Sequence, residues 1–419
     1  MYSLSFLLLL VSHSYKAYTY NTIKNTLLIN LLLLLSPCKI TIYLAGGGVM
    51  VKYTFKDLCS IKTGKLDANA AVENGAYPFF TCSKEPLKID TYAYDCDCIL
   101  LAGNGEFNVN IYSGKFNAYQ RTYIIQVNDS GKTSLKYLFY LLKYNVAHLK
   151  NVCTGGVIKF IKLGNIQSIT VPEADIKIQQ KISIELDRLQ NAIDLKKQQL
   201  SSLDDLVKSR FIEMFGDPEI NEKIWTKTTM GNYITTLTDF NANGSYAYLD
   251  SNVTMYDDPH YALMVRTTDL ERNDFQNGVK YIDENAYQIL SKSKVFGGEI
   301  IMNKIGSAGK IYLMPHLDRP VSLGRNAFLF RYNENINTLF LYYQLSTEYG
   351  TAEILQHVKG ATTKTITKDA AKSIKIIVPP IELQNEFADF VKLIDKSKFV
   401  CQSNPSIFCV KFLRFRHPP

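Results

Sequence analysis

The chain has 419 residues, of which 46% are hydrophobic and 21% charged; this length predicts two or three domains, and this composition excludes wholesale disorder. The formal net charge of +8 is concentrated at the ends, because residues 1–49 and 400–419 carry +3 each and no acid. The body is therefore close to neutral, so overall charge gives no evidence for nucleic-acid binding, and any basic surface must come from local clustering.

Residues 1–49 differ from the rest of the chain and support two interpretations. The apolar run 27–45 is long enough to consider as a signal or membrane anchor, although Pro37 and Lys39 interrupt it. Alternatively this segment is a doubtful leader, because GGGVM (46–50) is what a purine-rich ribosome-binding site and a start codon look like when translated. The sequence VKYTFKDLCS that follows is typical of a soluble domain, which favours a start at the methionine and no membrane segment.

Residues 50–173 predict a first globular domain. A strand-like stretch at 98–103 precedes a glycine-rich turn, and FNAYQRTYIIQV (116–127) predicts a further strand. An amphipathic helix is expected over 134–149, followed by a glycine-opened loop and a strand that ends at Pro172.

Residues 174–217 contain the longest periodic segment and predict one helix of about 60 Å. Apolar side chains recur along it at 3-4 spacing and form a heptad seam that Lys196 and Arg210 interrupt. The seam consists of Ile182, Leu186, Leu189, Ile193, Leu200, Leu203, Val207 and Met214. Such a helix is longer than a globular core needs, which indicates a bridge between domains or a pairing with another helix.

Residues 218–379 repeat the order of the first domain. A strand and glycine turn at 299–309, a strand at 323–332 and a helix at 337–355 precede a second glycine-opened loop. The junctions TVPEADIKIQQKI (170–182) and IVPPIELQNEF (377–387) also match, each joining an apolar strand to a helix with Gln on its first turns. The pattern therefore predicts an internal duplication of domain plus helix.

A second spacer helix starts within residues 380–400, but its periodic part is less than half as long as the first helix. Residues 401–419 form an off-pattern tail that loses the helical period, and the Asn-Pro at 404–405 would break a helix. The tail is either a functional basic segment or the result of a frame change, and we favour the frame change. The second helix would then be truncated, and another reading frame just after codon 399 should encode its missing heptads.

Several patterns suggest metal or catalytic chemistry without its full requirements. Cys96 and Cys98 are closer than a Cys-x-x-Cys zinc half-site, so the eight irregularly spaced cysteines predict reduced thiols of a cytoplasmic protein. GSAGK (306–310) lacks phosphate-loop spacing, and Asp-Pro-His-Tyr (258–261) only approaches an amino-methyltransferase motif. The acidic residues of 173–175 suit a helix start better than a nuclease metal site. We expect no catalytic residue and no metal site.

Two variable domains, each followed by a long helix, closely resemble the specificity subunit of type I restriction–modification systems over roughly residues 50–400. The resemblance rests on FNAYQRTYII, IGSAGKIYLM, the GGVIKFI and GATTKTI loops, the Val-Pro-helix junctions and LDDLVKSRFIEMFGDP. It implies an α+β fold with two target-recognition domains in pseudo-twofold repeat. Their two helices would pair as an antiparallel coiled-coil spacer, with the second helix truncated.

The resemblance also implies a non-catalytic DNA-binding subunit whose domains each read one half of a split, asymmetric sequence. Its expected partners are double-stranded DNA, two modification subunits that methylate adenine, and restriction subunits. S-adenosylmethionine, ATP and Mg would reside on those partners, with no cofactor in this chain. A truncated second helix would make the product a defective allele. The competing hypotheses are a membrane-anchored helical scaffold and a degenerate stand-alone DNA methyltransferase.

Base readout calls for Arg or Lys at guanine and Asn or Gln at adenine. Such side chains surround the predicted strand turns of both domains, and lysines in the two glycine-opened loops suit phosphate contacts. Each of them is equally compatible with a solvated loop. The candidate DNA-binding residues are Asn108, Asn110, Lys115, Asn117, Gln120, Arg121 and Lys159 in the first domain, and Asn303, Lys304, Lys310, Arg325, Asn326 and Lys364 in the second.

Overall fold

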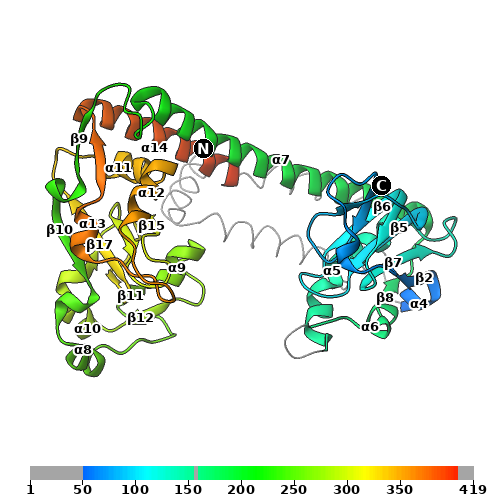
Figure 1. Ribbon diagram of the computed structural model, residues 1–419. Coiled ribbons are helices and arrows are strands. Elements are labelled where there is room, and N and C mark those ends of the chain that lie inside the picture. The colour runs from blue at the N-terminus through cyan, green and yellow to red at the C-terminus, as the bar shows by residue number, and fades with distance from the viewer. Residues whose placement is uncertain (1–50, 155–158, 404–419) are drawn as a thin grey trace, which may run out of the picture. The chain divides into compact units, whose positions relative to one another are not determined.

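The computed structural model describes residues 51–154 and 159–403 and divides into two compact units that meet within the long central helix, after Leu195 (Figure 1). The expectations for the leader at 1–49, for Gly155 and for residues 404–419 lie outside the described residues. Within the described ranges, no helix combines the length and the apolar character needed to span a membrane.

The first domain is built on a six-stranded sheet in which β5, flanked by β6 and β7, is the most deeply buried strand. The strand order is β2 (Cys59–Thr63), β7 (Thr122–Val127), β5 (Tyr94–Ala102), β6 (Val109–Ala118), β3 (Tyr77–Phe80) and β4 (Leu87–Ile89). Ile99 and Leu101 face a core formed with α5 (Leu135–Val152), whereas Cys98 and Leu100 pack with Phe80 and other residues on the opposite face. Burial on both faces explains why CILLA is continuously apolar instead of alternating.

Short elements complete this domain. They are β1 (Val51–Thr54), α4 (Phe55–Leu58), the 3-10 helix η1 (Ala68–Ala70), α6 (Leu163–Gln167) and β8 (Thr170–Pro172). The first and last strands of the domain, β1 and β8, pair antiparallel. The chain therefore enters and leaves the domain at one place, beside the start of the long helix.

The second domain contains a four-stranded antiparallel sheet with the order β10 (Ile234–Asp239), β17 (Ala327–Tyr332), β14 (Ile300–Asn303) and β15 (Ile311–Leu313). This order matches β2-β7-β5-β6 of the first domain. The closing pair β9 (Thr226–Thr229) and β18 (Lys375–Val378) likewise matches β1 and β8. The predicted duplication is thus present in the hydrogen-bonded topology, and the fold is α+β.

A second sheet of this domain corresponds to the edge of the first domain's sheet that β6, β3 and β4 form, because an antiparallel strand pair again joins its neighbour through one parallel pairing. Its order is β12 (Lys280–Ile282), β11 (Ala262–Val265), β16 (Val321–Leu323) and β13 (Lys294–Val295). The helical elements of this domain are η2 (Met230–Tyr233), η3 (Phe240–Asn243), α8 (Tyr246–Asn252), α9 (Thr267–Arg272), α10 (Glu284–Ile289), η4 (Ser291–Ser293), α11 (Thr338–Leu345), α12 (Glu348–Gln356) and α13 (Lys368–Lys372). The two domains are therefore copies of one scaffold with different additions.

Two buried glutamines explain why the strand-to-helix junction occurs twice. Gln179 accepts a hydrogen bond from the backbone N–H of Ser134 at 2.8 Å, and Gln384 accepts one from Asn337, also at 2.8 Å. Ser134 and Asn337 are the N-caps of α5 and α11, and each glutamine amide also donates to two backbone carbonyls. The same side chain therefore ties each of the helices that follow the two junctions to the start of α5 or α11 in its own domain.

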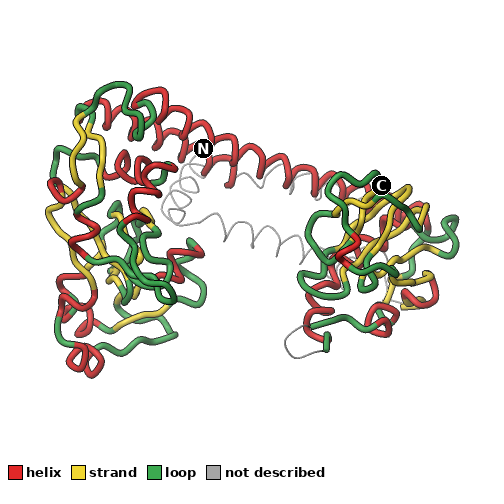
Figure 2. Tube along the Cα trace, viewed as in Figure 1, coloured by secondary structure: helices red, strands yellow, loops and turns green. Residues whose placement is uncertain are grey.

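The long helix α7 (Ile176–Phe215) has 40 residues and the C-terminal helix α14 (Ile381–Ser403) has 23 (Figure 2). In the second unit, α14 lies beside the end of α7. Asp204 pairs with Lys398 at 2.7 Å and Arg210 with Glu386 at 3.1 Å, so the two helices run antiparallel. The described part of this helix extends to residue 403, beyond the range of 380–400 that the sequence predicted.

Both ends of the apolar seam on α7 are covered by other parts of the protein. Val207 is fully buried against α14, and Met214 packs on the same cluster. At the other end of α7, Leu186 is buried, and Ile182 packs against the core of the first domain. A truncated second helix predicts that much of the 186–214 seam has no helix to cover it, but both ends of this stretch are covered, because each domain buries the part of α7 nearest to it. Leu189, Ile193, Leu200 and Leu203 are half-buried.

Candidate nucleic-acid interface

Three loops converge at one end of each domain through matching backbone hydrogen bonds. In the first domain, the N–H of Gly103 after β5 donates to the carbonyl of Arg121 at 2.8 Å. In the second, the N–H of Lys304 after β14 donates to Asn326 at the same distance. The third loop pairs with these through isolated bridges, Asn104 with Phe160 and Ile305 with Thr365. We call each set of three loops the tip of its domain.

The tips collect several of the residues that the sequence singled out. Arg121 and Lys159 lie on tip loops of the first domain and are exposed, as is the neighbouring Gln120. In the second tip, Lys364 and Asn326 are exposed, and the N–H of Gly306 donates to the carbonyl of Lys364 at 3.0 Å. The exposed side chains of the first tip and those of the second are more than 200 residues apart in sequence, yet they lie on corresponding loops of the two domains.

Other candidates lie elsewhere or are engaged within the protein. Asn117 is 4% exposed and bonds the backbone at Ala118 and Thr91, and Asn303 is 2% exposed and donates to the Tyr312 hydroxyl. Because these two side chains support the sheet, we leave them out of the proposed surface. Asn108 and Asn110 are half-buried beside and on β6, Lys115 lies over the Tyr92 ring, and Lys310 pairs with Glu271 at 3.6 Å.

Lys304 takes part in a charged cluster that the sequence did not reveal. Its ammonium lies 2.6 Å from the carboxylate of Asp239, and Lys368 lies 3.0 Å from the other oxygen. Burial by itself raises the pKa of Asp239, but the hydrogen bonds and charges of the two lysines outweigh it, so the pKa is lowered. One carboxylate facing two ammonium groups leaves this part of the tip with a net positive charge.

Replacing Asp239 with Asn should lower the free energy of unfolding of the second domain by about 1–3 kcal/mol, because the largely buried Lys304 loses its carboxylate. The contribution of Asp239 should be fully present above pH about 4, the ordinary carboxyl value, and fade as the pH falls toward its lowered pKa. Urea titrations of both proteins at several pH values measure this difference. Asp369→Asn, which alters an exposed ion pair, is the control and should have little effect.

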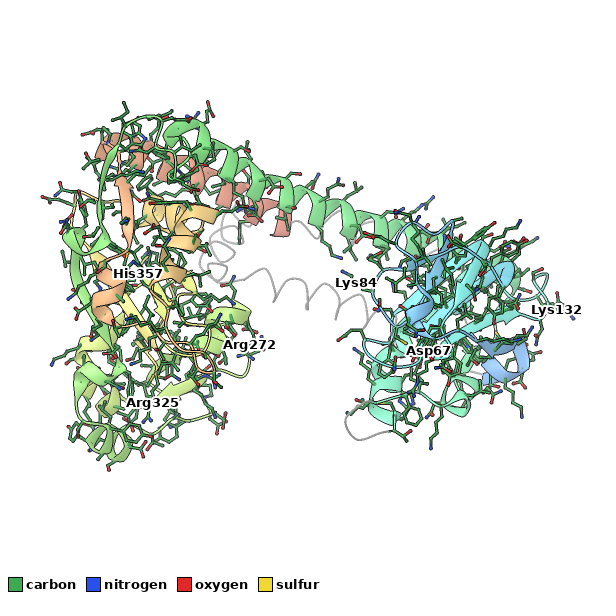
Figure 3. The ribbon with its side chains drawn as sticks, viewed as in Figure 1. Asp67, Lys84, Lys132, Arg272, Arg325 and His357 are labelled. Atoms are coloured by element: carbon green, nitrogen blue, oxygen red, sulfur yellow. The ribbon has the colours of Figure 1, made fainter. Side chains whose placement is uncertain are left out.

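Arg325 is held on several sides at the second tip. Its guanidinium lies over the rings of Tyr246 at 4.8 Å and Phe240 at 5.1 Å, and one nitrogen donates to Asp250 at 2.9 Å. The hydrogen bond to Asp250 raises the pKa of Arg325, and the opposing effect of burial does not offset it. Figure 3 shows Arg325 at the end of the domain that carries α8 and α10, away from α14. The side chain is positioned before any ligand binds.

The motifs that suggested chemistry have structural roles. Asp258, Pro259 and His260 form an exposed turn in which the His260 ring stacks on Tyr256 at 3.9 Å. Among the described cysteines, Cys59, Cys82, Cys96, Cys98 and Cys153 are free thiols. Within the part of the chain that the structure describes, no group of three or more His, Cys, Asp or Glu side chains is arranged to hold a metal ion.

The model of the type I restriction modification DNA specificity domain matches residues 49–204 and 224–400, which together form most of the chain. The chain belongs to this family. Each matched stretch contains one copy of the duplicated scaffold, and the interval between them contains the end of α7 and the turn that follows it. The predicted family is confirmed.

Known specificity subunits show the same relationship. The chain is 38% identical over 152 residues to the type I restriction enzyme EcoDI specificity subunit of Escherichia coli, a match that covers 36% of this chain and 34% of that protein. It is 23% identical over 311 residues to the MjaVIII specificity subunit of Methanocaldococcus jannaschii, covering 71% and 72% of the two chains. The match thus spans about a third of the Escherichia coli relative.

A solved structure from the same family supports the fold. The S subunit of a type I restriction–modification system from M. genitalium aligns with a TM-score of 0.52 at 16% identity, covering 85% of this chain and 92% of that one. At this identity the likeness concerns the fold alone.

The sequence analysis did not identify the residues that hold the Lys304 and Arg325 side chains in place at the second tip. Asp239, Phe240, Tyr246, Asp250 and Lys368 come from β10, η3, α8 and α13. They reach Lys304 and Arg325 only through the tertiary fold, and no local pattern marks them.

Proposed function

We propose that this chain is the DNA-recognition subunit of a type I restriction–modification complex, and that its two domains read the two halves of a bipartite, asymmetric target. The main support for this proposal is that both copies of the scaffold have cationic and amide side chains on their tips. These side-chain types suit the edges of guanine and adenine. Because the additions differ between the copies, we expect the two half-sites to differ in sequence.

The proposed partners are double-stranded DNA, two modification subunits and restriction subunits. The chain itself is proposed to be non-catalytic. Adenine methylation with S-adenosylmethionine and DNA restriction with ATP and Mg are then the work of the partners. The helix α7 connects the two domains and is proposed to set the number of base pairs between the half-sites. Membership of the specificity-domain family supports this assignment, and no observation on the described residues favours the membrane scaffold or the stand-alone methyltransferase.

We expect the chain alone to bind DNA weakly and with little sequence preference, since the body is nearly neutral and the partners are proposed to supply much of the DNA clamp. With the modification subunits, binding should become sequence-specific. Its affinity should fall steeply between about 50 and 200 mM salt, by about 10³-fold or more if six or more phosphates are contacted. Fluorescence anisotropy with a labelled duplex measures both cases. Tight, salt-insensitive binding by the chain alone would count against the assignment.

A further inference from the structure

The dipeptide before β7 and the one before β17 occupy the same position in the two copies. Gln120-Arg121 and Arg325-Asn326 are aligned by the hydrogen bonds from Gly103 to Arg121 and from Lys304 to Asn326. Each pair combines one arginine with one amide side chain, in opposite order. We propose that this dipeptide is the base-reading turn of each domain, and that Arg325 contacts a guanine in the half-site of the second domain. This inference rests on the proposed function.

The surroundings of Arg325 favour base reading over a simple phosphate contact. Two aromatic rings and Asp250 limit the orientations of its guanidinium, and the side chain keeps 32% of its surface exposed. A guanidinium has five N–H donors, more than Asp250 and Tyr246 can accept, so donors remain for a ligand. A phosphate contact needs only a mobile cation, whereas a planar fork held in one orientation suits a bidentate acceptor.

The hydrogen-bond donors of the guanidinium favour guanine over the other bases. Guanine presents two acceptors, O6 and N7, side by side in the major groove, and arginine bonded to both is the commonest specific contact of this kind. Adenine offers a donor beside its N7, which matches an amide instead. Asn326 follows Arg325 directly, is exposed, and has a positive φ of 69° that asparagine tolerates. The turn therefore offers one group for guanine next to one for adenine.

Lysines close to the turn provide the contacts that position DNA without specifying sequence. Lys364 is exposed on the neighbouring loop, and Lys368 keeps 37% of its surface exposed while it pairs with Asp239. Loss of such a lysine should weaken binding to all sequences about equally. Loss of Arg325 should instead change which sequences are preferred. This difference separates the two roles experimentally.

The test uses the full chain assembled with its modification subunits, and a pool of duplexes in which every base of the wild-type site is varied. For Arg325→Ala we expect the preference for guanine at one position of one half-site to fall by about 5- to 150-fold, with the other half-site unchanged. Arg325→Lys keeps the charge and should lose most of the same preference. Lys375→Ala removes an exposed cation on β18, which pairs with β9 near α14, and is the matched control.

Each outcome distinguishes the inference from the proposed function. A uniform loss of affinity in Arg325→Ala that Arg325→Lys restores would mean a phosphate contact, and unchanged base preferences in both variants would mean no contact; either result overturns the inference. Arg121→Ala should relax a guanine in the other half-site and provides a second test if Arg325→Ala fails to fold. If the wild-type complex shows no sequence preference, the proposed function itself fails.

Discussion

Replacing Phe387 with Ala should destabilise the second domain by about 3–5 kcal/mol, the usual cost of removing a fully buried phenylalanine. The ring of Phe387 lies 5.5 Å from that of Phe211, 5.6 Å from Phe215 and 5.5 Å from Tyr343. It therefore joins α14 to both α7 and α11. Its loss should leave a cavity where these three helices meet.

The single tryptophan of the chain makes this effect measurable. Trp225 packs on the same cluster, and its indole N–H donates to the carbonyl of Phe215 at 2.8 Å, so its fluorescence reports unfolding of this core. Urea titration should show a lower midpoint for the Phe387→Ala protein. Leu393→Ala changes a side chain of the same helix that is 61% exposed, and it should shift the midpoint little. Equal midpoints for Phe387→Ala and the wild type would refute the proposed packing role of α14.

Inserting four residues after Leu200 should move the recognised half-sites apart while leaving their sequences unchanged. Four residues lengthen a helix by about 6 Å, which corresponds to one or two base pairs at about 3.4 Å each. The insertion lies before Asp204, which pairs with Lys398, so it leaves the contacts between Phe211 and Phe387 in place. Methylation of the original site should fall to background.

The matched control is the same insertion after Ser130, in the exposed turn between β7 and α5. This insertion lengthens the chain without lengthening α7 and should leave the gap unchanged. The methylation pattern of DNA treated with each complex decides the question. If the α7 insertion changed the recognised bases and kept the gap, the helix would not set the spacing.

The sequence predicted best those features that repeat or have a long period. The heptads within 174–217 predicted α7, observed as Ile176–Phe215, and the repeated Val-Pro-helix junction predicted the duplication. The reason for the Gln in each junction became clear only from the structure, since Gln179 and Gln384 act on helix starts 45 and 47 residues away. Local patterns carry no information about such distant partners.

Short strands and tertiary polar contacts were beyond the reach of periodicity. The strands of the second sheet have two to four residues, too few to show alternation. Asn117 and Asn303 lie near turns in sequence but inside strands in space, which explains why they are buried. Arg325 was a candidate for its side chain alone, whereas its position depends on Asp250, 75 residues earlier in the chain. The DNA contacts of the exposed candidates stay predictions.

The most direct measurement is a map of methylated adenines in DNA from cells that carry this chain together with its modification subunits, compared with cells that lack the chain. Our account predicts methylation that depends on the chain and falls within one asymmetric sequence, made of two specific stretches separated by a gap of fixed length. Methylation that persists without the chain, or that follows a single unsplit sequence, would contradict the proposal that two domains each read half of a bipartite target.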